Sequence, residues 1–458
     1  MAEDDKADSS ELKSPIEPEL LAAEIVVPTL ALAPPSSEPA GWLQKTLKIF
    51  GPGLVTGAAD DDPSGIATYS SIGAQFGYTM LWTMPLIYPF MGAIQEISAR
   101  LGRVTGRGIA GNMGRFYPAW MLYIIVFLLL VANIINIGAD IGAMGAAVTL
   151  LVGGPTLIFC AVFALVSVLL EVFVPYQKYS AILKWLTLSL FAYVGTVFVV
   201  QIDWKNALQG TFVPNISLKS DYLAALIAVL GTTISPYLLF WQSEEEVEQM
   251  EGVPGEEPLK NAPRQAPEQL KRIKIDTYVG MGASNLIAYF IILTTAVTLH
   301  AHGKTQIDTA AQAAEALRPI AGVFASLLFS LGIIGTGLLA LPVLAGSAAY
   351  AVAEALHWPV GLERKAREAK AFYGVLALAT LVGLALNFMK LDPIKGLVWA
   401  AIINGVTAAP VMCYMMLLAT RREVMGKLTL PAYLKVLGWL ATGIMALAAI
   451  GLLLTSGH

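Results

Sequence analysis

The sequence predicts an all-α membrane protein with about eleven spanning helices. Hydrophobic residues make up 56% of the 458 residues, charged residues only 14%, and the mean hydropathy is +0.66. Soluble domains carry about 25% charged residues. Apolar segments close to the roughly 20 residues that a span needs follow one another along the chain. A net charge of −4 and two isolated cysteines give no sign of a nucleic-acid partner, a disulfide framework or a metal–thiolate site.

The chain divides into a polar tail and one membrane domain. Residues 1–45 are acidic and rich in Pro, Ser and Glu, so we expect a disordered cytoplasmic tail. Residues 46–458 are expected to form the transmembrane domain. Its spans are predicted at 47–77, 79–101, 118–150, 155–174, 179–201, 221–248, 273–300, 319–354, 367–388, 395–419 and 430–455.

Basic residues are concentrated in alternate loops and set the predicted orientation. The richer loops include Arg100, Lys271, Lys274 and Lys427. By the positive-inside rule these loops are cytoplasmic, which also places the N-terminus inside. We therefore expect an integral protein of the plasma membrane (the inner membrane in a bacterium). Its predicted partners are the lipid bilayer and a divalent metal ion, and no protein partner follows from the sequence.

The first span contains a break signal. Its middle holds three adjacent carboxylates, followed by Pro63, Ser64 and Gly65. A charge near the bilayer midplane costs about 2.5–3.5 kcal/mol on insertion scales, which makes such residues candidates for function. Proline and glycine beside them predict that the helix breaks at the charges. Asp62, directly before the proline, is the predicted ligand, whereas Asp60 and Asp61 are expected to line a vestibule or to support the ligand from behind.

The sixth span carries a second break signal, Gly231-Thr232-Thr233-Ile234-Ser235-Pro236. Spans one and six are five spans apart and therefore run in opposite directions. Paired broken helices at corresponding positions indicate inverted repeats with a substrate site near the midplane. The repeats are predicted at 47–201 and 221–419, with 430–455 as an additional helix. The four glutamates that follow the break, between positions 244 and 248, are expected to form a solvated acidic cap.

Two stretches carry a family resemblance. The pattern GPG-x(8)-DP-x-G-x-AT-x(7)-FGY in span one and ARLGRVTGRGIAGNMGRFYP after span two resemble the NRAMP family of divalent metal transporters. The resemblance implies a LeuT-like fold of five plus five helices, broken at helices 1 and 6. It also implies import of a divalent metal, usually together with protons.

The departures from the family pattern concern the metal ligands. The resemblance places the family's aspartate on Asp62, its asparagine on Gly65 and its methionine on Ser235, and it places a backbone carbonyl ligand on Thr232. The soft thioether is thus replaced by a hydroxyl. Oxygen ligands without sulphur suit Mg²⁺, Ca²⁺ or Mn²⁺, and Mg²⁺ commonly keeps several waters. This pattern is similar to the NRAMP-related magnesium transporter branch.

The predicted proton carriers are also reduced. Two family histidines fall on Tyr237 and Gln242, and an Asp–Glu pair on span three becomes the single acid Asp140. Without groups that titrate near pH 7, proton coupling is expected to be weak or absent. Asn136 and Asn404 complete the candidates for lining or supporting the site, although asparagines inside spans more often bond to a neighbouring helix.

The predicted function is Mg²⁺ import by alternating access, with Mn²⁺ as the second choice of cargo. One alternative is a proton-coupled Mn²⁺/Fe²⁺ importer. A less favoured one keeps the fold but carries an amino acid or another organic substrate. An enzyme is not expected, because the sequence has no histidine cluster, nucleophile motif or glycine-rich phosphate loop. The metal is cargo, and no cofactor is predicted.

Overall fold

A computed structural model describes residues 56–57, 59–174, 188–362, 364–389 and 392–455. The predicted N-terminal tail, 1–45, lies outside these ranges, and the bounds of the two repeats stay predictions. The described part is helical and contains no strand. The first half of the chain forms α3 (Pro63–Phe76), α4 (Thr83–Thr105), α5 (Ile109–Phe116), α6 (Ala119–Val152), α7 (Thr156–Phe173), α9 (Phe191–Val197) and α10 (Trp204–Phe212). The second half forms α11 (Ser220–Thr233), α12 (Pro236–Glu251), α13 (Ala266–Thr298), α14 (Ala310–Ala314), α15 (Arg318–Ala321), α16 (Ala325–Ala355), α17 (Lys370–Leu386), α18 (Pro393–Thr420), α19 (Arg422–Met425) and α20 (Ala432–Thr455).

Every predicted span contains helix in its described part. Eight helical stretches are long and apolar enough to cross a membrane, counted over the described residues. The stretch α4 is also long, at 23 residues, but its second half carries Glu96, Arg100 and Arg103. The helix α3 has only 14 residues because it starts at the break. The fifth predicted span, 179–201, is described from residue 188 onward and includes α9.

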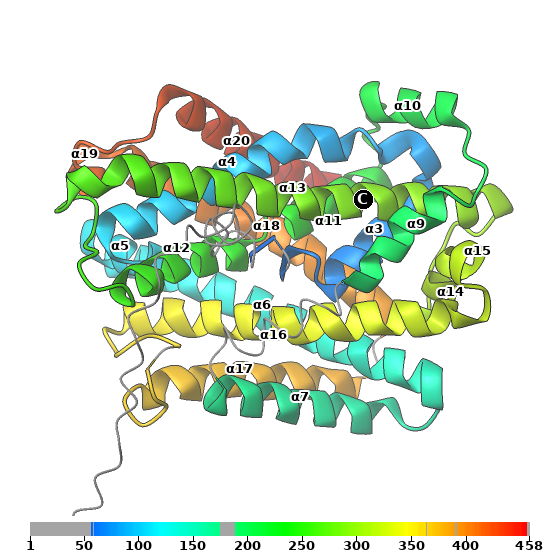
Figure 1. The fold of residues 1–458 in the computed structure, drawn as a ribbon, viewed down its shortest axis with the longest axis horizontal. Coiled ribbons are helices and arrows are strands. Elements are labelled where there is room, and N and C mark those ends of the chain that lie inside the picture. Colours follow the sequence, from blue (N-terminus) through cyan, green and yellow to red (C-terminus); the bar gives the residue numbers. More distant parts are fainter. Residues whose placement is uncertain (1–55, 58, 175–187, 363, 390–391, 456–458) are drawn as a thin grey trace, which may run out of the picture. The chain divides into compact units, whose positions relative to one another are not determined.

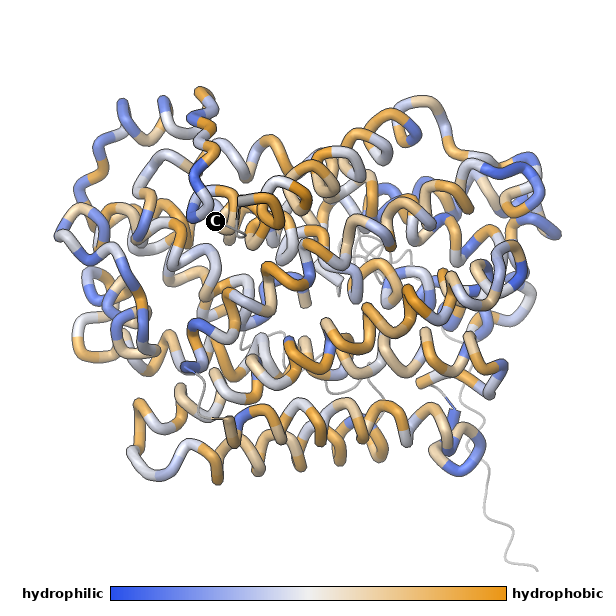
Figure 2. The backbone as a smooth tube through the Cα atoms, turned by 180° about the vertical axis from the view of Figure 1, so that it is seen from behind, coloured by the Kyte–Doolittle hydropathy of each residue, from blue (hydrophilic) through white to orange (hydrophobic). Residues whose placement is uncertain are grey.

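The helices form an inner group and an outer layer. In Figure 1, α7 and α17 lie next to each other along one side, and α6 and α16 lie between them and the remaining helices. Figure 2 shows long hydrophobic stretches along the helices and hydrophilic residues gathered near their two ends. This distribution is typical of helices that cross a bilayer.

The broken helix pair α11–α12 is the most enclosed of the candidate spans. Of its most apolar 18 residues, 83% are buried, whereas the corresponding shares are 22% for α7 and 33% for α17. A lipid-facing helix exposes apolar side chains, as α7 does with Ile158, Val162 and Leu165. The break in α11–α12 therefore lies in the protein interior, where freed backbone groups can find partners.

A backbone-to-backbone crossing fixes α11 against α18. A Cβ atom added to Gly231 would collide with the carbonyl oxygen of Ala401 and with the backbone of Gly405. Only glycine permits helices to approach this closely. The crossing lies at the end of α11, just before the break.

We expect Gly231→Ala to lower the free energy of unfolding by about 1–3 kcal/mol, because an extra methyl group would force two backbones apart. The measurement is the melting temperature in detergent. Gly443→Ala in α20 is the matched control, since a Cβ there would meet no atom within 4 Å. Equal melting temperatures for the two variants would contradict the crossing.

Candidate metal-binding site

A new helix begins at each of the two predicted breaks, and both of these helix starts are buried in the protein. Asp62 is the N-cap of α3, with φ −66° and ψ 170°, and Pro63 is the first helical residue. At the second break Ile234 leaves the helical conformation, with φ −124° and ψ 59°, and Ser235 precedes the new helix that begins at Pro236. Proline suits the first turn of a helix because its missing N–H would have no partner there. Both predicted breaks are therefore present.

Asp62 accepts more hydrogen bonds than the other carboxylates of the site. Its Oδ1 accepts hydrogen bonds from Ser64 Oγ at 2.6 Å and from the backbone N–H of Gly65 at 2.7 Å. Its Oδ2 accepts from Asn136 Nδ2 at 3.0 Å and from the Tyr237 hydroxyl at 3.2 Å. The side chain is 1% exposed. Helices α3, α6 and α12 thus converge on one buried carboxylate through neutral donors.

The two breaks lie close to each other at Gly65 and Thr232. A Cβ atom at Gly65 would lie 3.1 Å from Thr232 Oγ1 and 3.3 Å from the carbonyl oxygen of Asp60. Thr232 Oγ1 is buried, and the Tyr69 side chain is its polar neighbour. A buried hydroxyl oxygen therefore faces the position where the resemblance places the family's asparagine.

Ser235 lies in the second break, but its hydroxyl is turned toward its own chain. Ser235 Oγ lies 2.7 Å from the carbonyl oxygen of Gly231 and 3.0 Å from that of Thr232, and its one hydrogen serves one of them at a time. The bond satisfies a carbonyl group at the end of α11, where carbonyl groups lack partners within the helix. The hydroxyl oxygen keeps its lone pairs and can still accept or coordinate.

Asp60 and Asp61 share a partner that the sequence did not single out. Ser284 on α13 lies with its Oγ 2.6 Å from Asp60 Oδ2 and 3.0 Å from Asp61 Oδ1. A hydroxyl has one hydrogen to donate, so it serves one of the two carboxylates at a time. No ion pair to Asp60, Asp61 or Asp62 occurs within the described ranges. Buried carboxylates of this kind favour a bound cation or proton.

Asp140 and Asn404 are buried near the site with unpaired polar atoms. Asp140 follows Asn136 by one turn of α6 and therefore lies on the same face. Both of its carboxylate oxygens lack a hydrogen-bond partner in the described structure. Asn404 on α18 is fully buried, and neither its amide nitrogen nor its oxygen is paired there. No partner for either residue was predicted, and the structure shows none for these atoms among the residues it describes.

Gln242 contacts the chain ahead of the first break. Its Oε1 accepts a hydrogen bond from Thr56 Oγ1 at 2.5 Å. The sequence did not indicate this contact, because threonine in an apolar segment is common and carries no spacing signal. Gln242 therefore joins α12 to the stretch that precedes Asp62.

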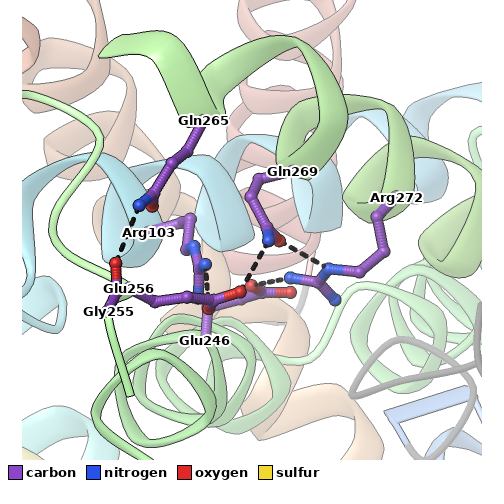
Figure 3. Close-up of polar contacts among 7 residues, drawn as sticks. All are labelled: Arg103, Glu246, Gly255, Glu256, Gln265, Gln269 and Arg272. Carbon is purple, nitrogen blue, oxygen red and sulfur yellow. Dashed lines mark hydrogen bonds and ion pairs between the residues drawn. The ribbon is translucent and has the colours of Figure 1, made fainter. Parts of the chain in front are cut away.

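The far end of α12 and the loop that follows it are each held by an ion pair. Arg272 on α13 pairs with Glu246, and Arg103 on α4 pairs with Glu256 (Figure 3). Gln269 Nε2 donates to Glu256 at 2.9 Å, and Arg272 Nε donates to Gln269 Oε1 at 3.0 Å. Glu246 is fully buried. The expected solvated acidic cap is thus wrong for Glu246, because basic side chains from neighbouring helices cover it.

No group of three or more His, Cys, Asp and Glu side chains is arranged to hold a metal ion in the part of the chain that the structure describes. A cation at Asp62 would therefore need further ligands from carbonyl, hydroxyl or amide oxygens or from water. Such ligands are available at both breaks.

Known proteins match the whole membrane domain. Residues 53–455 match the family described as Nramp, natural resistance-associated macrophage protein-like. The divalent metal cation transporter MntH of Klebsiella pneumoniae (strain 342) is 24% identical over 409 residues, covering 87% of this chain and 92% of that protein. The protein of the same name from Acidiphilium cryptum (strain JF-5) is 25% identical over 427 residues, covering 90% and 88%.

Solved structures share the arrangement of helices. The manganese transporter of Eremococcus coleocola, in complex with an aromatic bis-isothiourea substituted compound, has a TM-score of 0.69 at 16% identity and covers 90% of this chain and 87% of its own. MhsT in complex with L-phenylalanine has a TM-score of 0.60 at 12% identity, covering 88% and 98%. These likenesses confirm the predicted LeuT-like fold. Together with the family match over nearly all of the membrane domain, they show that the chain belongs to the Nramp family.

Proposed function

We propose that this membrane protein is a transporter of divalent metal cations, with Mg²⁺ as its cargo and Mn²⁺ as the second choice, and that it is not an enzyme. The observation that carries the proposal is Asp62, a buried carboxylate at a helix break whose described partners are all neutral. The names of the bacterial relatives support metal transport in general. The choice of Mg²⁺ rests on the ligand chemistry of this chain.

The proposed ligands are Asp62, Gly65, Thr232 and Ser235. Asp62 supplies the charge, and the other three supply hard oxygens and space. The support for this set is the approach of Gly65 to Thr232 Oγ1 and the presence of Ser235 in the second break. Oxygen donors with room for water suit Mg²⁺, which gives up its hydration shell reluctantly. Asp60 and Asp61 are buried beside Asp62 and form no ion pair in the described ranges, so in this proposal their charge attracts the ion from beside the ligands.

The proposed mechanism is alternating access around the two broken helices. The membrane potential drives entry, since each charge gains about 2.3 kcal/mol per 100 mV. A dication therefore needs no coupled ion to accumulate. We place the protein in the plasma membrane with its N-terminus in the cytoplasm, which agrees with the distribution of basic residues in the loops.

Weak or absent proton coupling is part of the proposal. Tyr237 and Gln242 stand where the resemblance places histidines, and neither titrates near pH 7. The second candidate function is a proton-coupled Mn²⁺/Fe²⁺ importer. The observation in its favour is Asp140, a buried acid with no partner in the described structure and one helical turn from Asn136. The name of the Eremococcus manganese transporter also favours it.

Asp62→Ala is expected to reduce Mg²⁺ uptake into proteoliposomes at least 10- to 100-fold, since even residues behind a metal ligand contribute that much to affinity. The assay compares Mg²⁺ with Mn²⁺ and records lumenal pH. Asp203→Ala is the matched control, because Asp203 also caps a helix through its side chain but lies at α10. Normal uptake by Asp62→Ala would refute the site. Mn²⁺-driven acidification without Mg²⁺ entry would favour the second candidate.

Asn136→Ala is expected to weaken Mg²⁺ binding about 10- to 100-fold by releasing Asp62 Oδ2. The measurement is isothermal titration calorimetry in detergent. Asn133→Ala is the comparison on the same helix, because Asn133 donates to Leu344 O and Ser347 Oγ on α16 instead. It should lower the melting temperature and leave Mg²⁺ affinity unchanged. Equal affinity losses in the two variants would show that Asn136 acts through stability alone.

Ser235→Met is expected to raise the ratio of Mn²⁺ to Mg²⁺ uptake roughly 10-fold, because a thioether favours the softer ion. The ratio is measured in proteoliposomes with both ions present. Thr442→Met serves as control, since Thr442 also bonds to a carbonyl of its own helix but lies on α20. If transport continues with an unchanged ratio, Ser235 is not a ligand.

A further inference from the structure

A basic pocket lies at the common end of three membrane helices, away from the proposed metal site. Its volume is about 470 Å³. It is formed by the end of α4, the start of α13 and the loop that leads into α20. Its lining residues are Arg100, Leu270, Lys271, Lys274, Lys427, Leu428, Thr429, Pro431 and Tyr433. The sequence placed its four basic residues in three separate loops on the same side of the membrane, and the structure gathers them around one pocket.

One of the four cations is neutralised from within the protein. Arg100 pairs with the buried carboxylate of Glu96 at 2.6 Å and also donates to it through Nε at 2.8 Å. The Tyr433 hydroxyl lies 3.2 Å and 3.3 Å from the two oxygens of the same carboxylate. Glu96 therefore holds both side chains in the pocket wall.

The three lysines keep their charge uncompensated. Lys271, Lys274 and Lys427 form no ion pair within the described residues. Lys274 Nζ lies 4.9 Å from the centre of the Tyr433 ring, where a cation–π contact orients it at the pocket. The lining residues thus present three positive charges to whatever occupies the pocket. An anion is the complementary ligand.

Exposed apolar faces lead away from the pocket along two of its helices. On α20, Val436, Leu440 and Leu447 are 58%, 51% and 71% exposed and share one face by their spacing. On α13, Ile275 and Val279 are also exposed, and they follow the two lysines of this helix in the sequence. Helices α13 and α20 are long and apolar enough to cross a membrane. Exposed apolar faces on such helices suit acyl chains, so a basic pocket at their end suits a lipid headgroup.

We propose that this pocket binds the phosphate of an anionic phospholipid, whose acyl chains lie along the exposed face of α20. Basic pockets between membrane helices on the cytoplasmic side suit anionic headgroups. A zwitterionic lipid brings its own cation, which the three lysines would repel. Free phosphate would use the lysines but not the apolar face. The proposal is independent of the proposed cargo, because no residue of the pocket belongs to the metal site.

The test is native mass spectrometry of the full-length protein released from detergent, titrated with phosphatidylglycerol. We expect one tightly retained lipid. The combined variant Lys271→Gln, Lys274→Gln and Lys427→Gln should weaken retention about 100-fold, since each basic residue near an anionic lipid contributes roughly 5-fold. The matched control is Lys365→Gln, Arg367→Gln and Lys370→Gln, which removes three exposed cations near the start of α17. It should retain the lipid as the unmodified protein does.

Three results would overturn the proposal. The first is equal loss in both triple variants, which would indicate general electrostatic attraction. The second is equal retention of phosphatidylcholine. The third is full displacement of the lipid by millimolar inorganic phosphate, which would indicate a free-anion site. Lys427→Glu alone, in the loop before α20, provides a second variant of minimal structural effect and should also lose retention.

Discussion

The structure depends on a buried carboxylate that is placed where a membrane helix stops and restarts. Asp62 caps α3 and receives donors from two further helices. A cap of this kind satisfies backbone N–H groups that would otherwise be unpaired in an apolar interior. The carboxylate that caps the start of α3 is thus the same one that we propose as the ligand of the cation. A continuous helix here would displace the Asp62 carboxylate from its present position. Replacing Asp62 by a residue without a side-chain acceptor would leave the backbone N–H of Gly65 without this partner.

The two breaks are unequal partners. The first carries three acidic residues, whereas the second contributes hydroxyl and carbonyl oxygens from Thr232 and Ser235. Under the proposed function, charge on one side and neutral dipoles on the other would attract a dication without binding it through several carboxylates. A transporter needs this balance, because an ion that is held too tightly is not released.

The sequence predicted the order of the spans and both breaks for clear physical reasons, and the role of Asp62 as a ligand stays a prediction. Hydropathy indicates which segments are buried in the bilayer or the protein interior. A proline next to charged residues indicates where a helix cannot continue. The contacts of Ser284 and Thr56 could not be predicted, since they depend on which helix faces which. The burial of Glu246 was mispredicted for the same reason, because its partner Arg272 lies on another helix. The direction of the Ser235 hydroxyl depends on its side-chain rotamer, which cannot be predicted from the spacing of residues in the sequence.

The polar contacts at the far end of α12 have a mechanical meaning. Arg103 and Glu246 are fully buried, and each is paired with a residue of another helix or loop. Separating a buried charge from its partner costs several kcal/mol. Moving α12 alone away from α13 would separate Glu246 from Arg272, and moving the loop after α12 away from α4 would separate Glu256 from Arg103. A motion that carries α4, α12, α13 and this loop together leaves both pairs intact, so we expect these segments to move as one unit.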